Sequence, residues 1–338
     1  MRIAIDAMGG DHAPDAMVAG VLTSRLSADV TLLLVGQEER LRPLLVAPRA
    51  AGGAAIEIVP AADVVAMQES PVQAVRGKPN SSLVVCAELV RRGEAEAMVS
   101  AGNTGAALAA GALKLGRIRG VDRPAITCLL PNRRGFTVLL DAGANVDVGP
   151  QNLLQFALMG EIYAREVLGV SRPRVGLLNV CEEATKGNRV VQSAYPLLAE
   201  APIQFVGNIE GPDLFDGGTD VAVCDGFVGN IVLKVGEGAA EFLRHLLREE
   251  VLGHPIMRFP ALLMKAGLRR IVKRTDYREV GGAPLLGVNG VCIISHGRSN
   301  AVAIANALDT AEKAVTHGVI DKIRAEVGTG VLAGNSGD

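Results

Sequence analysis

The clearest candidate for chemistry is a glycine-rich turn between a strand-like run and a helix-like run. In the stretch SAGNTGA, apolar residues give way to Gly102, Asn103 and Thr104, and an alanine-rich segment follows. A helix that begins at such a turn presents free backbone N–H groups, which bind anions. The stretch therefore predicts an anion site, although these residues are also common turn formers.

A second stretch places two cations before serine residues. Arg76 and Lys78 precede Ser81 in RGKPNSSL, and the run that follows is typical of a helix. Cations beside hydroxyl groups at a helix start suit phosphate. The alternative is an ordinary serine cap with two solvated cations beside it.

His296 is the candidate for managing a proton. It follows the apolar run VCIIS and precedes Gly297 and Arg298. Histidine side chains titrate near neutral pH when they are unperturbed, which suits acid and base catalysis. A histidine at a strand end is also often a hydrogen-bonded structural residue, and His12 carries the same two interpretations.

Several other strand-like runs end at glycine and a small polar or acidic residue. Ligands of doubly wound sheets bind at the carboxyl ends of the strands, so we expect these residues to share one pocket at one edge of the sheet. Turn formation alone is the alternative for each of them. The candidate binding residues are Asp6, Gly9, Gly10, Asp11, Ser81, Gly102, Thr104, Asp141, Asn145, Asp225 and Ser295.

Some familiar site motifs are missing. SAGNTGA is not G-x-G-x-x-G, and no G-x-x-x-x-G-K-[ST] occurs, so neither dinucleotide nor P-loop chemistry is supported. Without G-x-S-x-G a serine hydrolase is not expected, and without H-E-x-x-H or C-x-x-C we expect no metal site. The widely spaced cysteines are interpreted as small core residues in a reducing compartment.

The elements that must position these residues alternate along the chain. Short apolar runs and longer alanine-rich stretches predict an α/β fold with a three-layer, doubly wound, mostly parallel sheet. Runs 125–131 and 136–143 resemble a hairpin, either an antiparallel sheet edge or a dimer-forming arm. The other expected strands are 2–6, 30–36, 55–60, 96–102, 174–180, 202–208, 221–226 and 291–297, and the main expected helices are 81–92, 103–115, 150–168, 188–199, 227–250 and 299–316.

The amino-acid composition argues against further classes of function. The 338 residues are 49% apolar, and 34 basic residues stand against 36 acidic ones. This balance, with 3% aromatic residues and no Trp, argues against a nucleic-acid binder. No apolar run is long enough to span a membrane and no signal peptide is apparent, so we expect a cytoplasmic protein.

Residues 255–274 form a basic amphipathic stretch. Its apolar arc includes Phe259, Leu263 and Leu268, its basic side includes Arg269 and Lys273, and Arg270 lies at the border between them. A basic amphipathic helix binds anionic membranes or an acidic partner. The alternative is a core-packed helix with a solvated basic face.

The motifs together resemble the PlsX family of bacterial phosphate acyltransferases. IAIDAMGGDHAP, KPNSS, VSAGNTGA, LLDAGAN, NIEG, VCDGFVGN and ISHGRSN occur in this order between residues 3 and 300. The resemblance implies a fold similar to those of isocitrate and isopropylmalate dehydrogenases and phosphotransacetylases. It also implies one domain over 1–330, with 255–274 as a helical protrusion and 331–338 as a flexible tail.

The same resemblance implies a reaction and its partners. An acyl group would pass from acyl carrier protein to inorganic phosphate, and a membrane glycerol-3-phosphate acyltransferase would use the acyl phosphate to make phosphatidic acid. The family forms homodimers, associates peripherally with the inner face of the cell membrane, and needs no cofactor or metal. Arg117, Arg119 and Arg123 offer one basic docking surface for the acidic carrier protein, and the 255–274 stretch offers another.

We assign provisional roles on residue chemistry and on the matched motifs. Lys78, Ser81 and the Gly102–Thr104 backbone hold phosphate, Asn103 or Asn230 donates to the oxyanion, and His296 manages a proton. Three other functions stay open: a nicotinamide-dependent decarboxylating dehydrogenase, a membrane scaffold without activity, and a phosphotransacetylase acting on acetyl-CoA.

Overall fold

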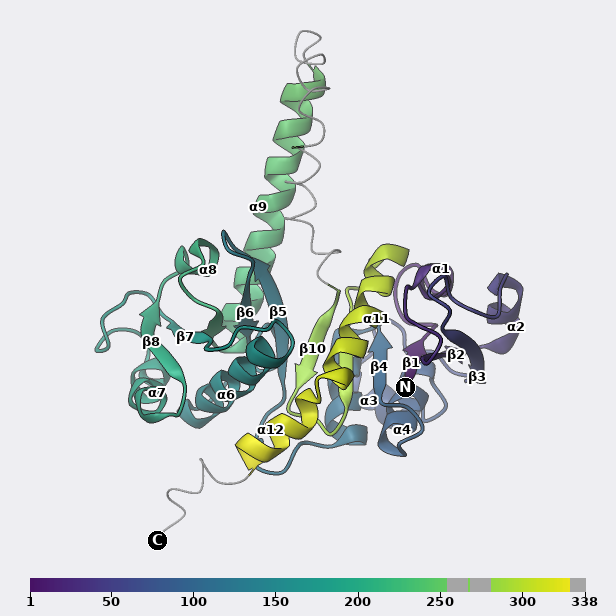
Figure 1. Cartoon of the computed structure of the whole chain (residues 1–338), viewed down its shortest axis with the longest axis horizontal. Helices are drawn as coiled ribbons and strands as arrows, with labels where there is room; N and C mark the ends of the chain where they lie inside the picture. The colour runs from purple at the N-terminus through teal and green to yellow at the C-terminus, as the bar shows by residue number, and fades with distance from the viewer. Residues whose placement is uncertain (254–266, 268–280, 329–338) are drawn as a thin grey trace.

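One mixed sheet runs through the whole molecule. The computed structural model describes residues 1–253, 267 and 281–328, and over these residues the sheet has 11 strands (Figure 1). Their order is β3-β2-β1-β4-β11-β10-β5-β6-β9-β7-β8. Most neighbours are parallel, so the expected α/β class with a mostly parallel sheet is confirmed.

The first half of the sheet is entirely parallel. Its central strand pairs β2 on one side and β4 on the other, and β11 pairs β4. The residues of β1, β2, β4 and β11 are mostly apolar and buried, as expected for strands covered on both faces, whereas those of the edge strand β3 are partly exposed. The strands are β1 (Arg2–Asp6), β2 (Thr31–Gly36), β3 (Ala55–Pro60), β4 (Ala97–Ser100) and β11 (Val291–Ile294).

Antiparallel strands join the two halves. β10 (Ala283–Leu286) pairs both β11 and β5 (Ala125–Pro131), and β5 pairs β6 (Phe136–Leu140). The expected hairpin is confirmed, but its placement at a sheet edge was wrong, because β10 and β9 flank it. β10 was not among the expected strands, because its four residues include Pro284 and no β-branched residue.

The second half is again parallel but runs the other way. β9 (Val221–Val223), β7 (Arg174–Leu178) and β8 (Gln204–Ile209) follow the direction of β6. Three antiparallel pairings separate β6 from β11. The carboxyl ends of the two halves therefore leave the sheet at opposite edges, and the expectation of a single shared edge was wrong.

Helices cover both faces of the sheet. On one face, Met17, Phe156 and Ile304 pack with β1 residues such as Ile5 in the largest core cluster. On the other face, the two helices that follow the Ser81 and Asn103 turns pack on Ala4 and Met98. The helices are α1 (Asp15–Thr23), α2 (Glu38–Leu41), α3 (Pro71–Gly77), α4 (Ser82–Arg91), α5 (Thr104–Ala110), α6 (Pro150–Glu166), α7 (Arg189–Glu200), α8 (Asp213–Asp216), α9 (Gly226–Gly253), α11 (Ala301–Thr316) and α12 (Val319–Gly328), with shorter turns η1 (Arg42–Leu44) and η2 (Gly111–Leu115).

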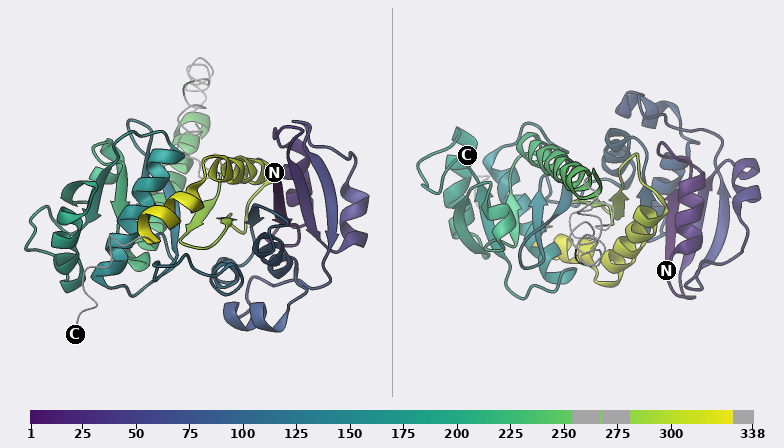
Figure 2. Two further views of the ribbon diagram at one scale, coloured as in Figure 1. Left: turned by 60° about the horizontal axis from the view of Figure 1, so that its bottom comes forward. Right: turned by 90° about the horizontal axis from the view of Figure 1, so that it is seen from above.

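The C-terminal helices connect the two halves of the molecule. α11 lies beside α1 of the first half, and α12 packs on α6 of the second (Figure 2). Arg165 of α6 forms ion pairs with Glu161 at 2.7 Å and with Glu326 of α12 at 2.6 Å. These contacts and the continuous sheet join both halves into one body.

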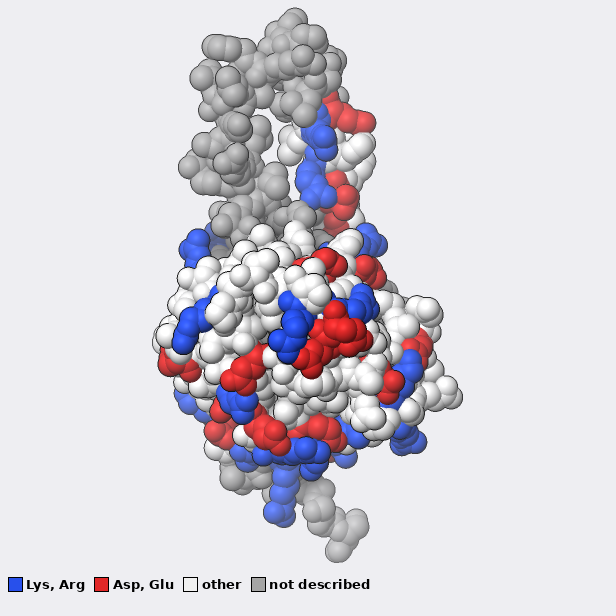
Figure 3. All heavy atoms as spheres, turned by 90° about the vertical axis from the view of Figure 1, so that its right-hand side faces the viewer, with Lys and Arg blue, Asp and Glu red and all other residues white. Residues whose placement is uncertain are grey.

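Helix α9 extends well beyond the edge of the sheet (Figure 1). The amphipathic stretch 255–274, with Phe259, Leu263, Leu268, Arg269, Arg270 and Lys273, and the tail 331–338 lie outside the described residues. Over the described residues, no helix combines the length and the apolar character needed to cross a membrane. The face of the first half in Figure 3 carries acidic and basic side chains intermingled.

Candidate functional site

Asp6 is the buried anchor of the first edge. It ends β1, and its carboxylate accepts hydrogen bonds from Ser82 at 2.5 Å and from Ser100 at 2.7 Å. Its side chain is almost fully enclosed, with 2% of the residue exposed. Burial raises the pKa of Asp6, and the two hydroxyl donors oppose that rise. Asp6 thus ties β1 to the ends of β4 and to the start of α4 instead of facing a ligand.

Three loops meet above this anchor. The Asp11 N–H donates to the Gly297 carbonyl oxygen at 2.8 Å, which joins the exit of β1 to the exit of β11. Gly10 has φ +109°, and a Cβ there would lie 3.0 Å from the Ala101 carbonyl oxygen and 3.2 Å from that of Gly297. Glycine is needed at this position for both reasons, the backbone conformation and the close approach of two loops.

We call these residues at the carboxyl ends of β1, β4 and β11 the exit cluster. It contains Asp6, Gly9, Gly10, Asp11, Ser82, Ser100, Gly102, Asn103, Thr104, His296 and Gly297. The MGGDH stretch is therefore one wall of a meeting point between three loops. Thr104 and Asp11 are exposed at its surface, whereas Gly102 is buried.

Asn103 holds a loop and a helix. Its side-chain oxygen caps α5 by accepting from the Ala106 N–H at 3.0 Å. Its amide nitrogen donates to the carbonyl oxygens of Met67 at 2.9 Å and Glu69 at 3.0 Å. Both amide hydrogens are used within the protein, so in this conformation Asn103 has none for an oxyanion.

Lys78 and Ser81 are also engaged by the protein. The Lys78 ammonium donates to Glu69 at 2.7 Å and to the Val64 carbonyl oxygen at 2.9 Å. This pairing lowers the pKa of Glu69. Ser81 is fully buried, caps α4 through the Val84 N–H, and donates to the Lys78 carbonyl oxygen. Met67 and Glu69 were not among the expected site residues, because only the folded loop brings them to Asn103 and Lys78.

His296 has a defined ring orientation. Its Nδ1 accepts a hydrogen bond from the Arg298 N–H at 3.1 Å. An accepting Nδ1 carries no proton, so the neutral ring carries its hydrogen on Nε2. The side chain of His296 is partly exposed, and that of Arg298 is exposed. His296 is thus set up as a hydrogen-bond donor through Nε2.

Ser295 is buried beneath the exit cluster. Its N–H donates to the Ser100 carbonyl oxygen at 2.8 Å, and its hydroxyl lies near Gly282, where an added Cβ would meet it at 3.1 Å. Only 3% of Ser295 is exposed, so its side chain is not accessible from solvent.

The remaining candidates lie at the opposite edge. Asp141, at the exit of β6, is fully buried and accepts hydrogen bonds from the N–H groups of Ile126, Gly143, Ala144 and Asn145 and from the Asn145 amide. Burial raises its pKa, and these donors oppose the rise. The Asn145 amide also donates to the Pro124 carbonyl oxygen at 2.7 Å. Asp141 and Asn145 therefore shape the loop before α6.

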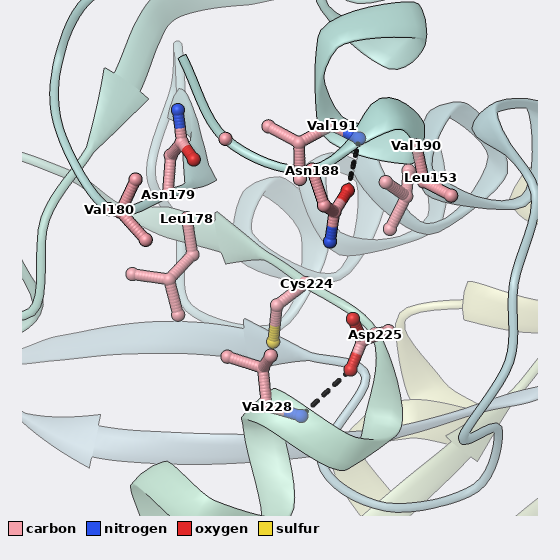
Figure 4. Close-up of a pocket in the computed structure, with 11 residues that line it drawn as sticks. Leu153, Leu178, Asn179, Val180, Asn188, Val190, Val191, Cys224, Asp225 and Val228 are labelled. Carbon is pink, nitrogen blue, oxygen red and sulfur yellow. Dashed lines mark hydrogen bonds between the residues drawn. The ribbon is translucent and has the colours of Figure 1, made fainter.

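Asp225 immediately precedes α9, and Asn230 lies near the start of that helix. Asp225 accepts from the Val228 N–H at 2.7 Å, and Asn230 is exposed beside Gly143. A cavity of about 380 Å³ opens next to Asp225 (Figure 4). None of its apolar lining residues was among the expected site residues, because valines and leucines at strand ends resemble core residues. The side chains of the described residues form no group of three His, Cys, Asp or Glu that could hold a metal ion.

The sequence has close curated relatives. Residues 1–322 match a family described as fatty acid synthesis protein. The phosphate acyltransferase of Desulfitobacterium hafniense is 52% identical over 328 residues, which cover 97% of this chain and 98% of that protein. That of Pelotomaculum thermopropionicum is 51% identical over 338 residues, covering 100% of this chain and 98% of that one.

Solved structures share the fold at low identity. A phosphotransacetylase from Streptococcus pyogenes is 18% identical and has a TM-score of 0.60, covering 95% of this chain and 94% of its own. The EutD phosphotransacetylase from Staphylococcus aureus is 14% identical with a TM-score of 0.59, covering 93% of both chains. The expected similarity of fold to phosphotransacetylases is confirmed.

Proposed function

Because the chain belongs to the PlsX family of phosphate acyltransferases, which act in fatty acid and phospholipid synthesis, we propose that it transfers a long-chain acyl group from acyl carrier protein to inorganic phosphate. The single observation that carries this proposal is the near-complete match to curated phosphate acyltransferases. The acyl phosphate would then serve a membrane glycerol-3-phosphate acyltransferase.

The reaction requires little covalent help from the protein. A phosphate oxygen attacks the thioester carbonyl carbon, the C–O bond forms through a tetrahedral oxyanion, and the C–S bond breaks as the thiolate leaves with its electron pair. Thiols titrate near pKa ~8.5, so the leaving group needs no strong acid. Alignment of the two substrates and stabilisation of the oxyanion are the tasks that remain.

We place phosphate at the exit cluster. Thr104 and Arg298 are exposed there, and Arg76 is exposed on α3, which begins beside α5 because Pro71 packs closely against Gly105. Close loops built on glycine bring backbone groups near a small anion. His296, through its Nε2 hydrogen, would donate to phosphate or to the oxyanion. Lys78 is paired with Glu69, so we assign it to positioning the loop and not to binding phosphate directly.

The expected partners fit several surfaces. Arg117, Arg119 and Arg123 are exposed and offer a basic surface to an acidic carrier protein. The exposed apolar side chains of α9, such as Val235 at 64% and Phe242 at 61%, support a homodimer that covers them. From the sequence alone, we also propose that the chain associates peripherally with the inner face of the cell membrane through residues 255–274.

Thiol release from palmitoyl-acyl carrier protein tests the activity. We expect release only when inorganic phosphate is present, with acyl phosphate as the product. Arg298→Ala should raise the KM for phosphate about tenfold or more, because a lost charged hydrogen bond is worth about 1.5–3 kcal/mol. Arg172→Ala, which changes an exposed arginine of the second half, is the matched control. Release that does not depend on phosphate, or no release from folded protein, would contradict the proposal.

A further inference from the structure

The cavity of about 380 Å³ lies at the second edge, away from the exit cluster. It opens where β7 and β9 end and where α6, α7 and α9 begin (Figure 4). Six valine and leucine side chains line it, at positions 153, 178, 180, 190, 191 and 228. Its volume falls within the range of small-molecule sites, about 300–1,000 Å³. We call it the β7–α7 cavity.

Few polar groups face the β7–α7 cavity, and each has a defined orientation. The Asn188 oxygen accepts from the Val191 N–H at 2.9 Å, so its amide nitrogen is the end that points toward Cys224 and Asp225 (Figure 4). One Asp225 oxygen accepts from the Val228 N–H. The Asn179 amide hydrogens are used by Cys181 and Lys186 carbonyl oxygens, both at 3.1 Å. The cavity thus presents one amide donor and one carboxylate.

The wall of the cavity is held in place by amide side chains. Asn179 binds both ends of the loop over residues 181–186, and Asn208 of β8 donates to the Glu183 carbonyl oxygen at 3.0 Å. Gln192 of α7 donates to the carbonyl oxygens of Thr185 and Gly187, each at 3.0 Å. A cavity fixed from three elements is preformed, as ligand sites usually are.

The charge of the lining residues favours uncharged acyl ligands over anionic ones. None of the lining residues is Lys or Arg, and Asp225 supplies a carboxylate. A fatty-acid carboxylate or an acyl phosphate would therefore meet repulsion without a compensating cation. An uncharged thioester would not, and its carbonyl oxygen suits the Asn188 amide.

We propose that the β7–α7 cavity binds the hydrocarbon chain of an uncharged acyl ligand, a thioester and not a free fatty acid. That the ligand is an acyl thioester rests on the proposed function, whereas the preference for an uncharged chain rests on the lining alone. Two sources share this chemistry: the acyl donor of the reaction, or a second thioester that binds at the edge opposite the exit cluster.

The test uses a reporter that the chain itself lacks. The sequence contains no Trp, and Val180 is 78% exposed at the rim of the cavity. Val180→Trp therefore introduces a single fluorophore with little disturbance. The probes are 11-bromoundecanoic acid and its methyl ester, because bromine quenches a neighbouring indole. At pH 8 we expect the ester to quench at a concentration several-fold lower than the acid.

Second substitutions locate the bound chain. In the Val180→Trp background, Val191→Phe fills the cavity and should weaken quenching by the ester at least tenfold. Val228→Leu provides a smaller filling if Val191→Phe does not fold. Val146→Phe, at an exposed position outside the lining, is the matched control and should leave quenching unchanged. Asp225→Asn retains a residue able to cap α9 and should remove the preference for ester over acid.

The outcomes separate the cavity from the reaction, because quenching needs no turnover. Equal quenching in the filled and unfilled proteins, or a preference for the acid, would overturn the proposal. If filling also shifts turnover from palmitoyl toward octanoyl donors, the cavity holds the acyl donor, and phosphate then binds at this edge and not at the exit cluster. If filling removes quenching but leaves the chain-length profile intact, the cavity holds a second thioester. Quenching by the ester without phosphate-dependent turnover would contradict only the proposed function.

Discussion

The Ser100 hydroxyl donates to the Asp6 carboxylate at 2.7 Å and accepts from the Gly102 N–H at 3.1 Å. All three residues are buried. One hydroxyl therefore connects the charged end of β1 to the glycine turn that starts α5. We infer that this link between two neighbouring strands holds the loops of the exit cluster in position.

Ser100→Ala should destabilise the protein by about 1–3 kcal/mol, because it leaves a buried N–H without its acceptor and a buried carboxylate without one donor. The free energy of unfolding in urea measures the effect. Ser27→Ala is the matched control, since it removes an exposed serine that also bonds an aspartate, Asp29. We expect that control to change stability by less than about 0.5 kcal/mol. Equal effects of the two substitutions would disprove the role given to Ser100.

The raised pKa of Asp6 predicts a pH dependence of stability. Burial raises this pKa from its ordinary value near 3.8, so the folded state holds the proton to a higher pH than the unfolded state does. The folded state then binds more protons, and stability falls as the pH rises from about 4 through the raised pKa. Asp6→Asn removes this proton.

Urea unfolding of wild type and Asp6→Asn over pH 4–8 isolates the contribution of Asp6. The difference in unfolding free energy, wild type minus variant, should decrease with rising pH and become constant above the folded-state pKa. Asp141, whose pKa is also raised, is present in both proteins and cancels in the difference. A difference that stays constant throughout the range would show that Asp6 has the same pKa in both states.

Thiol reactivity should single out one of the five cysteines. Burial raises the pKa of Cys128 and Cys292 to about 12 and that of Cys86 and Cys224 well above its ordinary value. Cys181, on the loop after β7, and Cys128 are both partly exposed, but the raised pKa of Cys128 keeps it in the thiol form at pH 8. With Ellman's reagent at pH 8 we expect one fast thiol, which Cys181→Ser removes, because the thiolate is the reactive form. Several fast thiols in folded protein would refute this assignment.

The local pattern of the sequence predicted the strands with continuous apolar runs, because burial on both faces demands such runs. It also predicted the glycine turns at their ends. It did not reveal β10, whose four residues carry no strand pattern, or the three antiparallel pairings around it. Those pairings decide that Asp6 and His296 share an edge with each other and not with Asp141 and Asp225. Strand direction is set by long-range pairing, which local spacing does not encode.

The roles of individual polar residues were harder to predict for a related reason. Asn103 and Ser81 have the right type and spacing for a ligand site, and the same type and spacing suit helix caps. Only the folded loop over residues 64–69 supplies the carbonyl oxygens of Met67, Glu69 and Val64 that engage Asn103 and Lys78. Residue chemistry therefore proposed the site, and the contacts show which of its side chains are engaged within the protein.

Asn103→Ala tests whether Asn103 positions the loop or stabilises the oxyanion. Because both amide hydrogens are used within the protein, we expect kcat to fall less than about tenfold, whereas a lost oxyanion donor costs roughly 10²–10³-fold. The unfolding free energy should fall by about 1–2 kcal/mol, since α5 loses its cap. Asn230→Ala, at the opposite edge, should leave stability within about 0.5 kcal/mol. A hundredfold drop in kcat would instead show that Asn103 stabilises the oxyanion.

The hydrogen bond at Nδ1 of His296 allows two roles of this residue, donor and general base, to be distinguished by substitution. Since Nδ1 accepts from the Arg298 N–H, the neutral ring carries its hydrogen on Nε2, and the donor role assigns that hydrogen to the substrate. A glutamine side chain can place an amide hydrogen near the position of Nε2, and alanine cannot.

If His296 donates to phosphate or to the oxyanion, His296→Gln should keep kcat/KM within about tenfold of wild type, while His296→Ala loses roughly 10²–10³-fold. A general base at Nε2 would instead be lost equally in both variants, because an amide does not accept a proton near neutral pH. Phosphate-dependent thiol release from palmitoyl-acyl carrier protein by the two variants distinguishes these roles, and equal losses would exclude the donor role.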